Sequence, residues 1–159
     1  MSKQNAEIGQ ITMELDIDAT PERVWQALTD DIDHWWPAEF YAGGEHGKRR
    51  FVLEAQPGGR MYEQWDYGGG VLWGTVICAD PNTLLQVVGF SFPNWGGPSQ
   101  SYNTWELKAN GNGTTLIFSE STLGRVTDSS LAEKDQGWNF LWLTLKAHLE
   151  DQPPPQWQD

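Results

Sequence analysis

The sequence contains few of the residues that build covalent crosslinks or metal centres. Cys78 is the only cysteine among 159 residues, so neither an intrachain disulfide nor a cysteine-based metal site can form. Because it lies in an apolar strand pattern, we expect a buried, inert thiol rather than a nucleophile. The three histidines, His34, His46 and His148, lie in different segments without paired ligand spacing. We therefore predict no metal site.

Basic residues and long hydrophobic runs are also scarce. Ten Lys and Arg residues stand against 22 Asp and Glu, which gives a net charge of −12, and the one basic cluster covers only residues 48–50. This balance disfavours nucleic acid and anionic membranes as partners. No apolar run approaches the length of a membrane-spanning helix, and the start of the chain lacks the hydrophobic core of a signal peptide. We expect a cytoplasmic protein.

Motifs for nucleotide chemistry and for nucleophilic catalysis are missing as well. The glycine runs at residues 58–59 and 68–70 fall in expected hairpin turns rather than before a helix, so they do not form phosphate loops. No Gly-x-Ser-x-Gly elbow is present. The sequence therefore predicts no cofactor.

Tryptophan, in contrast, is abundant, with ten copies. Two interpretations stay open: these side chains line a large aromatic cavity, or they fill a bulky core and leave little room for a ligand. The length fits one domain over residues 1–159, with an ordered core of about residues 10–150.

A long helix near the end of the chain is the element around which we expect the rest to fold. Apolar residues recur there at steps of three and four, which is typical of one helix face; they are Trp138, Leu141, Trp142, Leu145 and Leu149. We predict a helix from about Ser130 to Glu150, roughly 30 Å long at 1.5 Å per residue.

The remainder of the sequence predicts short strands and two short helices. Alternation indicates a first strand at residues 11–17, with loose chain before Gly9. Thr20 and Pro21 then begin a helix that ends near Thr29, and a short helix or turn follows at residues 31–37. Six further strands are expected, at residues 51–55, 60–66, 71–79, 84–92, 102–108 and 114–121. Short turns between them predict an antiparallel meander, and hence an α+β fold.

Several segments resemble the START/SRPBCC (Bet v 1-like) superfamily. Residues 19–29 followed by Trp35-Trp36-Pro37 are similar to its opening, and residues 57–65 and 72–76 look like the middle of its AHSA-like branch, named for activators of the heat-shock protein 90 ATPase. Residues 113–120 and Gly137-Trp138 resemble its last strand and final helix.

The resemblance spans about residues 10–150 and implies the helix-grip fold. In that fold, a curved antiparallel sheet of about six or seven strands surrounds a long C-terminal helix, two short helices follow the first strand, and a cavity lies between sheet and helix. Members of the superfamily include lipid carriers, polyketide cyclases, aromatases, hormone receptors and chaperone activators, so the fold alone does not select a function.

The candidate cavity residues are mainly aromatic side chains, with a few polar or charged groups among them. They are Trp35, Trp36, Phe40, Arg60, Tyr62, Glu63, Trp65, Trp73, Phe90, Trp105, Phe118, Glu120, Trp138, Trp142 and Leu145. Glu63 and Glu120 are the candidate catalytic groups, because a carboxylate inside an aromatic cavity would have a raised pKa. The alternative for Glu63 is that it pairs with a neighbouring cation or lies at the solvent rim of the cavity. Arg60 is a candidate partner for a ligand carboxylate, with an outward salt bridge as the alternative.

Three functions remain open at this point. The leading hypothesis is a module that binds a small apolar or aromatic molecule in the cavity. The second is a cyclase or hydratase that uses Glu63 or Glu120, which requires a buried, pocket-facing carboxylate without a cationic partner. The third is a chaperone-activator-like interaction protein, which requires an exposed apolar patch near residues 92–98. We expect mobile gates at residues 41–50 and 92–101, and a homodimer is a further possibility.

Overall fold

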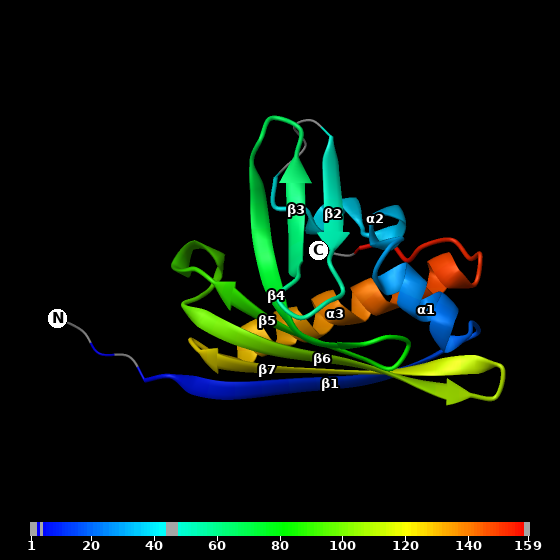
Figure 1. The fold of residues 1–159 in the computed structure, drawn as a ribbon. Coiled ribbons are helices and arrows are strands. Elements are labelled where there is room, and N and C mark those ends of the chain that lie inside the picture. Colours follow the sequence, from blue (N-terminus) through cyan, green and yellow to red (C-terminus); the bar gives the residue numbers. More distant parts are fainter. Residues whose placement is uncertain (1–2, 4, 44–47, 158–159) are drawn as a thin grey trace.

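A single antiparallel sheet curves around one long helix in the computed structural model, which describes residues 3, 5–43 and 48–157 (Figure 1). The strands follow the order β1-β7-β6-β5-β4-β3-β2. Their bounds are β1 (Glu7–Ile17), β2 (Arg49–Leu53), β3 (Arg60–Trp65), β4 (Gly70–Asp80), β5 (Leu84–Ser91), β6 (Ser99–Asn110) and β7 (Gly113–Gly124). The helices are α1 (Pro21–Leu28), α2 (Ile32–Trp35) and α3 (Asp128–Leu149), with 3₁₀ turns η1 (Ala38–Phe40) and η2 (Pro93–Trp95).

The predicted α+β architecture with an antiparallel meander is confirmed. Strands β2 to β7 pair in sequence order, and β1 closes the far edge by pairing with β7. One part of the prediction is wrong: Glu7 and Ile8, which precede Gly9, are not loose, because they already pair with Gly124 and Leu123. Backbone pairing with the long strand β7 extends β1 into a polar stretch that has no strand pattern of its own.

The sheet has two parts that differ in direction. Strands β1, β7, β6 and β5 form a long floor, whereas β2, β3 and the first half of β4 rise from it as an arm (Figure 1). Register shifts lie between Met61 and Tyr62 in the β3–β4 pair, and between Val76 and Cys78 in the β4–β5 pair. Such irregularities bend a strand, so β4 can belong to both parts.

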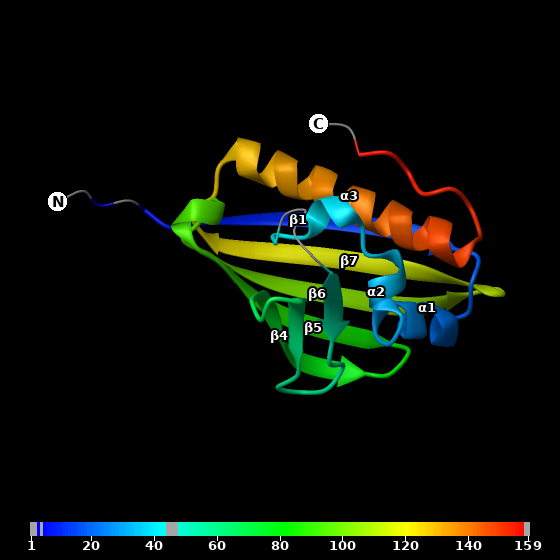
Figure 2. The same cartoon turned by 90° about the horizontal axis from the view of Figure 1, so that it is seen from above.

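Helix α3 lies over the floor, alongside β1 and β7 when viewed from above (Figure 2). It begins with a capping box, in which the Thr127 hydroxyl accepts from the Ser130 N–H and the Ser130 hydroxyl accepts from the Thr127 N–H. The boundaries agree with the predicted helix to within two residues at each end. Its inner face buries Leu141, Trp142 and Leu145 as the periodicity predicts.

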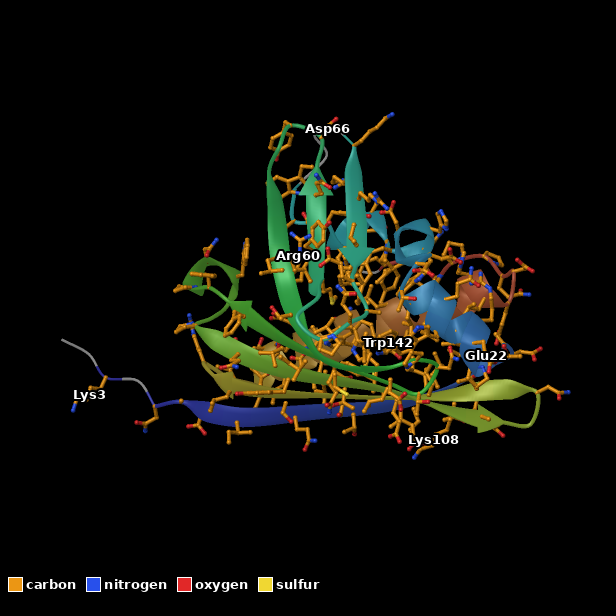
Figure 3. All side chains as sticks on the ribbon, in the orientation of Figure 1. Lys3, Glu22, Arg60, Asp66, Lys108 and Trp142 are labelled. Atoms are coloured by element: carbon orange, nitrogen blue, oxygen red, sulfur yellow. The ribbon has the colours of Figure 1, made fainter. Side chains whose placement is uncertain are left out.

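The core lies between α3 and the floor of the sheet. Trp142 is in this interior, whereas the charged side chains of Glu22 and Lys108 lie at the periphery (Figure 3). Phe118 of β7 is fully buried between Trp138 and Trp142, with ring centroids 4.4 and 5.3 Å away. Tryptophan therefore fills part of the space under α3, and the part that stays open is the candidate site.

Candidate functional site

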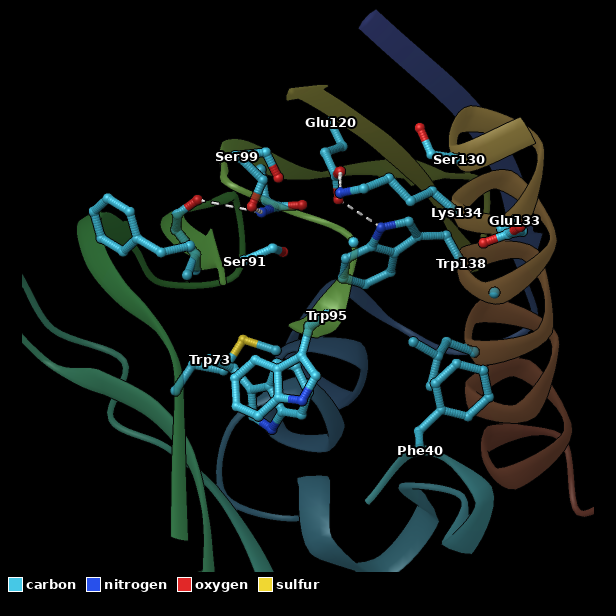
Figure 4. Close-up of a pocket in the computed structure, with 18 of the residues that line it drawn as sticks. Phe40, Trp73, Ser91, Trp95, Ser99, Glu120, Ser130, Glu133, Lys134 and Trp138 are labelled. Atoms are coloured by element: carbon cyan, nitrogen blue, oxygen red, sulfur yellow. Dashed lines mark hydrogen bonds and ion pairs between the residues drawn. The ribbon is translucent and has the colours of Figure 1, made fainter. Parts of the chain in front are cut away.

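A cavity of about 390 Å³, partly open to solvent, lies between α3 and the inner face of the sheet (Figure 4). Its residues come from α3, from strands β3 to β7, and from the segments that contain η1 and η2. They are Trp36, Phe40, Met61, Trp73, Val87, Phe90, Ser91, Trp95, Gly96, Ser99, Ser101, Asn103, Trp105, Glu120, Arg125, Ser130, Glu133, Lys134, Gly137, Trp138 and Leu141. This volume is in the range of small-molecule sites.

The floor of the cavity changes from apolar to polar along β6. Successive inward positions of a strand are two residues apart, and here they are Trp105, Asn103, Ser101 and Ser99. The pairing register places Val87 and Glu120 on either side of Asn103. The floor therefore runs from a buried indole at one end to hydroxyl groups at the other.

Aromatic rings form most of the remaining wall. Trp36 stacks on Phe51 at 3.8 Å between ring centroids. Trp73 of β4 stacks on Trp95 of η2 at 5.9 Å with an interplanar angle of 29° (Figure 4). Trp95 is 47% exposed, so this pair lies where the cavity meets solvent. The wall offers flat apolar surfaces that suit an aromatic or alicyclic ligand.

A charged cluster lies at the polar end, centred on Glu120. This carboxylate is 3% exposed and accepts hydrogen bonds from the Lys134 ammonium, from Trp138 Nε1 at 2.7 Å and from Thr122 Oγ1 at 2.8 Å (Figure 4). Lys134 and Trp138 are four residues apart, on one face of α3. The helix thus supplies both a cation and an indole donor to one buried carboxylate.

Arg125 is the other cation that lines the cavity. It follows β7 directly, and its backbone N–H donates to the Pro98 carbonyl at 2.9 Å. Within residues 3, 5–43 and 48–157, its guanidinium makes no ion pair and no hydrogen bond. The polar end of the cavity therefore presents a guanidinium whose five donors are not used by these residues.

Glu63 is the second buried carboxylate, and it is completely shielded from solvent. It accepts four hydrogen bonds: from the backbone N–H groups of Ala42 and Gly43 at 3.0 Å each, from Trp65 Nε1 at 2.6 Å, and from Trp73 Nε1 at 3.2 Å. No ion pair joins it to any cation in the described part of the chain. Four uncharged donors thus occupy the four lone-pair positions of this carboxylate.

The loop over Glu63 approaches Trp65 so closely that residue 43 must be glycine. A Cβ built on Gly43 would lie 2.3 Å from Trp65 Nε1, far inside van der Waals contact. This packing holds the two backbone N–H groups over the carboxylate. The segment after η1 is therefore fixed to the arm of the sheet through one side chain.

Tyr41 joins the same region to α2. Its hydroxyl donates to Asp33 Oδ1 at 3.0 Å, and the same oxygen accepts the Phe51 N–H at 2.6 Å. Burial, together with the nearby Asp33 carboxylate, raises the pKa of Tyr41 well above its usual range. Tyr41 therefore stays neutral and acts as a hydrogen-bond donor.

Part of the sequence-predicted set lines the cavity. These residues are Trp36, Phe40, Trp73, Phe90, Trp105, Glu120 and Trp138. Phe90 is 59% exposed, so it contributes only to the rim. Whether these side chains contact a ligand stays a prediction.

The other predicted aromatic and apolar residues lie elsewhere. Trp35 is in the core, where its Nε1 donates to the Ala27 carbonyl at 2.7 Å. Phe118 of β7 and the α3 residues Trp142 and Leu145 are buried in the core between sheet and helix. Trp65 donates its Nε1–H to Glu63. The alternation and helical periodicity that selected these residues identify an inner face, but they do not distinguish filled core from cavity wall.

Arg60, Tyr62 and Glu63 also lie outside the cavity, around a shallow groove on the arm. The Arg60 guanidinium forms an ion pair with Glu54 at 2.6 Å and lies over the Tyr62 ring at 4.7 Å. Hydrogen bonds from Arg60 lower the pKa of Glu54. For Arg60, the alternative of an outward salt bridge is therefore the one that the geometry supports.

Sequence reasoning missed most of the polar residues of the cavity. They include Ser99, Ser101, Asn103, Arg125 and Lys134. Two patterns in the sequence could have identified some of these residues. Asn103 and Ser101 share the strand alternation of Trp105, and Lys134 lies one helical turn before Trp138. Arg125 has no such periodic relation, because it directly follows Gly124, the last residue of β7.

The described residues contain no cluster of three or more His, Cys, Asp or Glu side chains that could hold a metal ion. His46 and the rest of residues 44–47, which belong to one expected gate, are outside the described part of the chain. The other expected loop is shorter than predicted, since η2 and the start of β6 occupy most of residues 92–101. None of the described helices has the length and apolar character needed to cross a membrane.

A curved antiparallel sheet closed on a C-terminal helix defines the helix-grip fold of the START/SRPBCC superfamily. Within it, the chain belongs to the family described as Activator of Hsp90 ATPase homolog 1-like protein, whose model matches residues 18–150. No curated protein sequence matches the chain.

Solved structures share the fold at low sequence identity. The Mll3558 protein from Rhizobium loti is 22% identical, with a TM-score of 0.72 over 92% of this chain and 100% of that chain. The Aha1 dimer from Colwellia psychrerythraea is 26% identical, with a TM-score of 0.62 over 89% and 96%. DynU16, a protein in the dynemicin biosynthetic locus, is 20% identical, with a TM-score of 0.68 over 93% of this chain and 49% of that chain.

Proposed function

We propose that this protein binds a small apolar or aromatic molecule in the cavity between α3 and the sheet. The observation that supports the proposal is an open space of about 390 Å³ lined by seven aromatic side chains, with polar groups gathered at one end. A space of this size in an otherwise tightly packed interior is uncommon. Residues 10–150 would act as one cytoplasmic domain.

The test uses a neutral aromatic probe, biphenyl-4-carboxamide, with isothermal titration calorimetry and tryptophan fluorescence. We expect saturable binding, because the rings match the aromatic walls. The variant Ser101→Phe would place a ring into the cavity from β6 and weaken binding at least about tenfold, since it occupies the ligand's volume. Ser119→Phe is the matched control, because Ser119 alternates with inward Phe118 and Glu120 and so lies on the outer face of β7.

Two results would contradict the proposal. One is no binding of any neutral aromatic probe, from one to three rings, to the wild-type protein. The other is equal weakening by Ser101→Phe and Ser119→Phe, which would show that the probe binds a surface site.

A second candidate function is interaction with a chaperone ATPase, as the family description suggests. Phe92 and Trp95 favour it, being 64% and 47% exposed in the segment where an apolar patch was predicted. Stimulation of an Hsp90-type ATPase by the wild-type protein, lost in Phe92→Ser, would support it. No change in the ATPase rate at saturating protein would exclude it. The relative described as a dimer makes self-association a further proposal, measurable by sedimentation.

The enzyme hypothesis lacks the carboxylate that it requires. Glu63 has no cationic partner in the described residues, but it lies outside the cavity and its lone pairs are occupied. Glu120 lines the cavity, but it is paired with Lys134. The geometry therefore favours binding over acid–base catalysis by either carboxylate.

A further inference from the structure

We propose that the natural ligand of the cavity is an aromatic or alicyclic carboxylate, whose acid group binds Arg125 and Lys134 at the polar end. This inference rests on the proposed function and specifies the chemistry of its ligand. It follows from three features of the cavity: the direction of its polarity, the pairing of its charges and the balance of its donors and acceptors.

The polarity of the cavity has one direction, which suits a molecule with one apolar and one polar end. Along β6 the floor passes from Trp105, which is 2% exposed, to Ser99, the first residue of the strand. The register pairs Ser99 with Gly124, the residue before Arg125. At about 3.4 Å per residue, Trp105 and Ser99 are roughly 20 Å apart. Arg125 therefore follows the strand end that lies opposite Trp105 along this floor.

The second feature is that Arg125, an exposed residue, lines the cavity without a charge partner among the described residues. The chain has 22 acidic and 10 basic residues, so a surface cation readily finds a carboxylate. Other cations do so, as in the pairs Arg23–Asp31 and Arg60–Glu54. Arg125 lines the cavity without any ion pair or side-chain hydrogen bond to the described residues. Its planar fork suits a carboxylate, which it can bind through two parallel hydrogen bonds.

Lys134 of α3 adds a second cation to the cavity lining. Its ammonium carries three N–H groups, of which one is directed at Glu120 Oε1. The side chain remains 29% exposed and lines the cavity. A ligand oxygen can therefore share this cation with Glu120.

The two carboxylates that line the cavity do not favour a cationic ligand. Glu120 already accepts from Lys134, Trp138 and Thr122, and Glu133 is exposed and accepts from Ser129 at 3.1 Å. The two cations that line the cavity, Arg125 and Lys134, keep N–H donors that no described residue uses. A ligand end rich in acceptors satisfies this arrangement, and a carboxylate does so with charge-assisted hydrogen bonds.

The experiment compares two probes of nearly equal shape, biphenyl-4-carboxylate and biphenyl-4-carboxamide, by calorimetry at neutral pH. We expect the wild-type protein to bind the acid about five to ten times more tightly than the amide. Arg125→Gln should remove most of this preference, measured as the ratio of acid to amide affinity within the same variant. Arg50→Gln is the control: Arg50 is exposed on β2, outside the cavity, and its loss changes the net charge by the same amount.

Each outcome separates the two proposals. Equal affinity for acid and amide, or an acid preference that survives in Arg125→Gln, would overturn this inference and leave the binding function intact. Loss of the preference in Arg50→Gln to the same extent would assign it to net charge and also overturn the inference. Failure of both probes to bind would remove the inference together with the function on which it rests.

Discussion

Two buried carboxylates on the inner face of the same sheet have opposite surroundings. Glu63, on the arm, is held by four uncharged N–H donors from Ala42, Gly43, Trp65 and Trp73. Glu120, on the floor, shares its charge with the Lys134 ammonium and lines the cavity. The first arrangement leaves no position for a ligand, so it joins elements of the fold. The second leaves a cation partly free at the cavity wall, so it can take part in binding.

Removal of the charge at Glu63 should have the largest effect on stability. In Glu63→Gln, the side-chain amide keeps one acceptor oxygen but turns an NH₂ group toward N–H donors. We expect the free energy of unfolding to fall by about 2–4 kcal/mol, because buried donors lose their acceptor.

Urea unfolding followed by circular dichroism measures this loss. Glu14→Gln is the control, since Glu14 is exposed on β1 and makes no ion pair within the described residues. A loss of under about 0.5 kcal/mol in Glu63→Gln, the range of ordinary surface substitutions, would show that the four hydrogen bonds do not hold the arm.

The second prediction concerns the ion pair of Glu120. Lys134→Met removes the cation and leaves the buried Glu120 carboxylate with only neutral donors. Because Lys134 is itself partly exposed, we expect a loss of about 1–2 kcal/mol rather than the larger cost of a fully buried pair.

A double-mutant cycle tests this assignment. Lys134→Met should cost less in a Glu120→Gln background, where no charge is left unpaired. Equal costs in both backgrounds would mean that Lys134 stabilises the protein through packing alone. The same variants, titrated with biphenyl-4-carboxylate, report on the contribution of Lys134 to binding.

A smaller effect is expected at Tyr41, on the Glu63 side of the comparison. Tyr41→Phe removes one hydrogen bond to Asp33 and should cost about 1 kcal/mol at neutral pH. Because folding raises the pKa of Tyr41, its contribution to the free energy of unfolding is complete below 10.0, the pKa of the side chain in the unfolded chain. This contribution is lost as the pH rises above that value. Unfolding free energies measured from about pH 8 to about pH 11 should thus converge for the two proteins. A constant difference over this range would contradict the assignment.

The smallest effect is a gain in stability at Gly137, on the cavity side. A Cβ at this position would lie 3.5 Å from Phe40 Cε1, an ordinary van der Waals distance. Gly137→Ala should therefore stabilise α3 by about 0.5–1 kcal/mol through helix propensity, and it should weaken probe binding because it narrows the cavity. Thermal unfolding and calorimetry measure the two changes. A loss of stability would show that the helix cannot accept the methyl group against Phe40.

Periodicity in the sequence predicted the scaffold well, and local chemistry predicted the site only in part. The apolar stripe from Trp138 to Leu149 and the alternation along β6 and β7 depend on repeats of 3.6 and 2.0 residues, which are visible in the sequence. They place Trp105 and Glu120 on the inner face correctly. They cannot tell a filled volume from an open one, because that depends on how the indoles of Trp138 and Trp142 pack.

The surroundings of the two carboxylates were the hardest to predict. The donors to Glu63 come from residues 42–43 on one side in sequence and from Trp73 on the other, so only the folded chain brings them together. The partner of Glu120 was also missed, although Lys134 lies four residues before Trp138 on the same helix face. Arg125 carries no periodic signal, and its position depends on the backbone contact with Pro98.

Trp73 belongs to both regions at once. Its ring lines the cavity and stacks on Trp95, while its nitrogen donates to Glu63 at 3.2 Å. Any molecule that displaces the ring must either lengthen that hydrogen bond or move the carboxylate together with Ala42 and Gly43. Occupancy of the cavity is therefore mechanically connected to the far arm of the sheet through one indole.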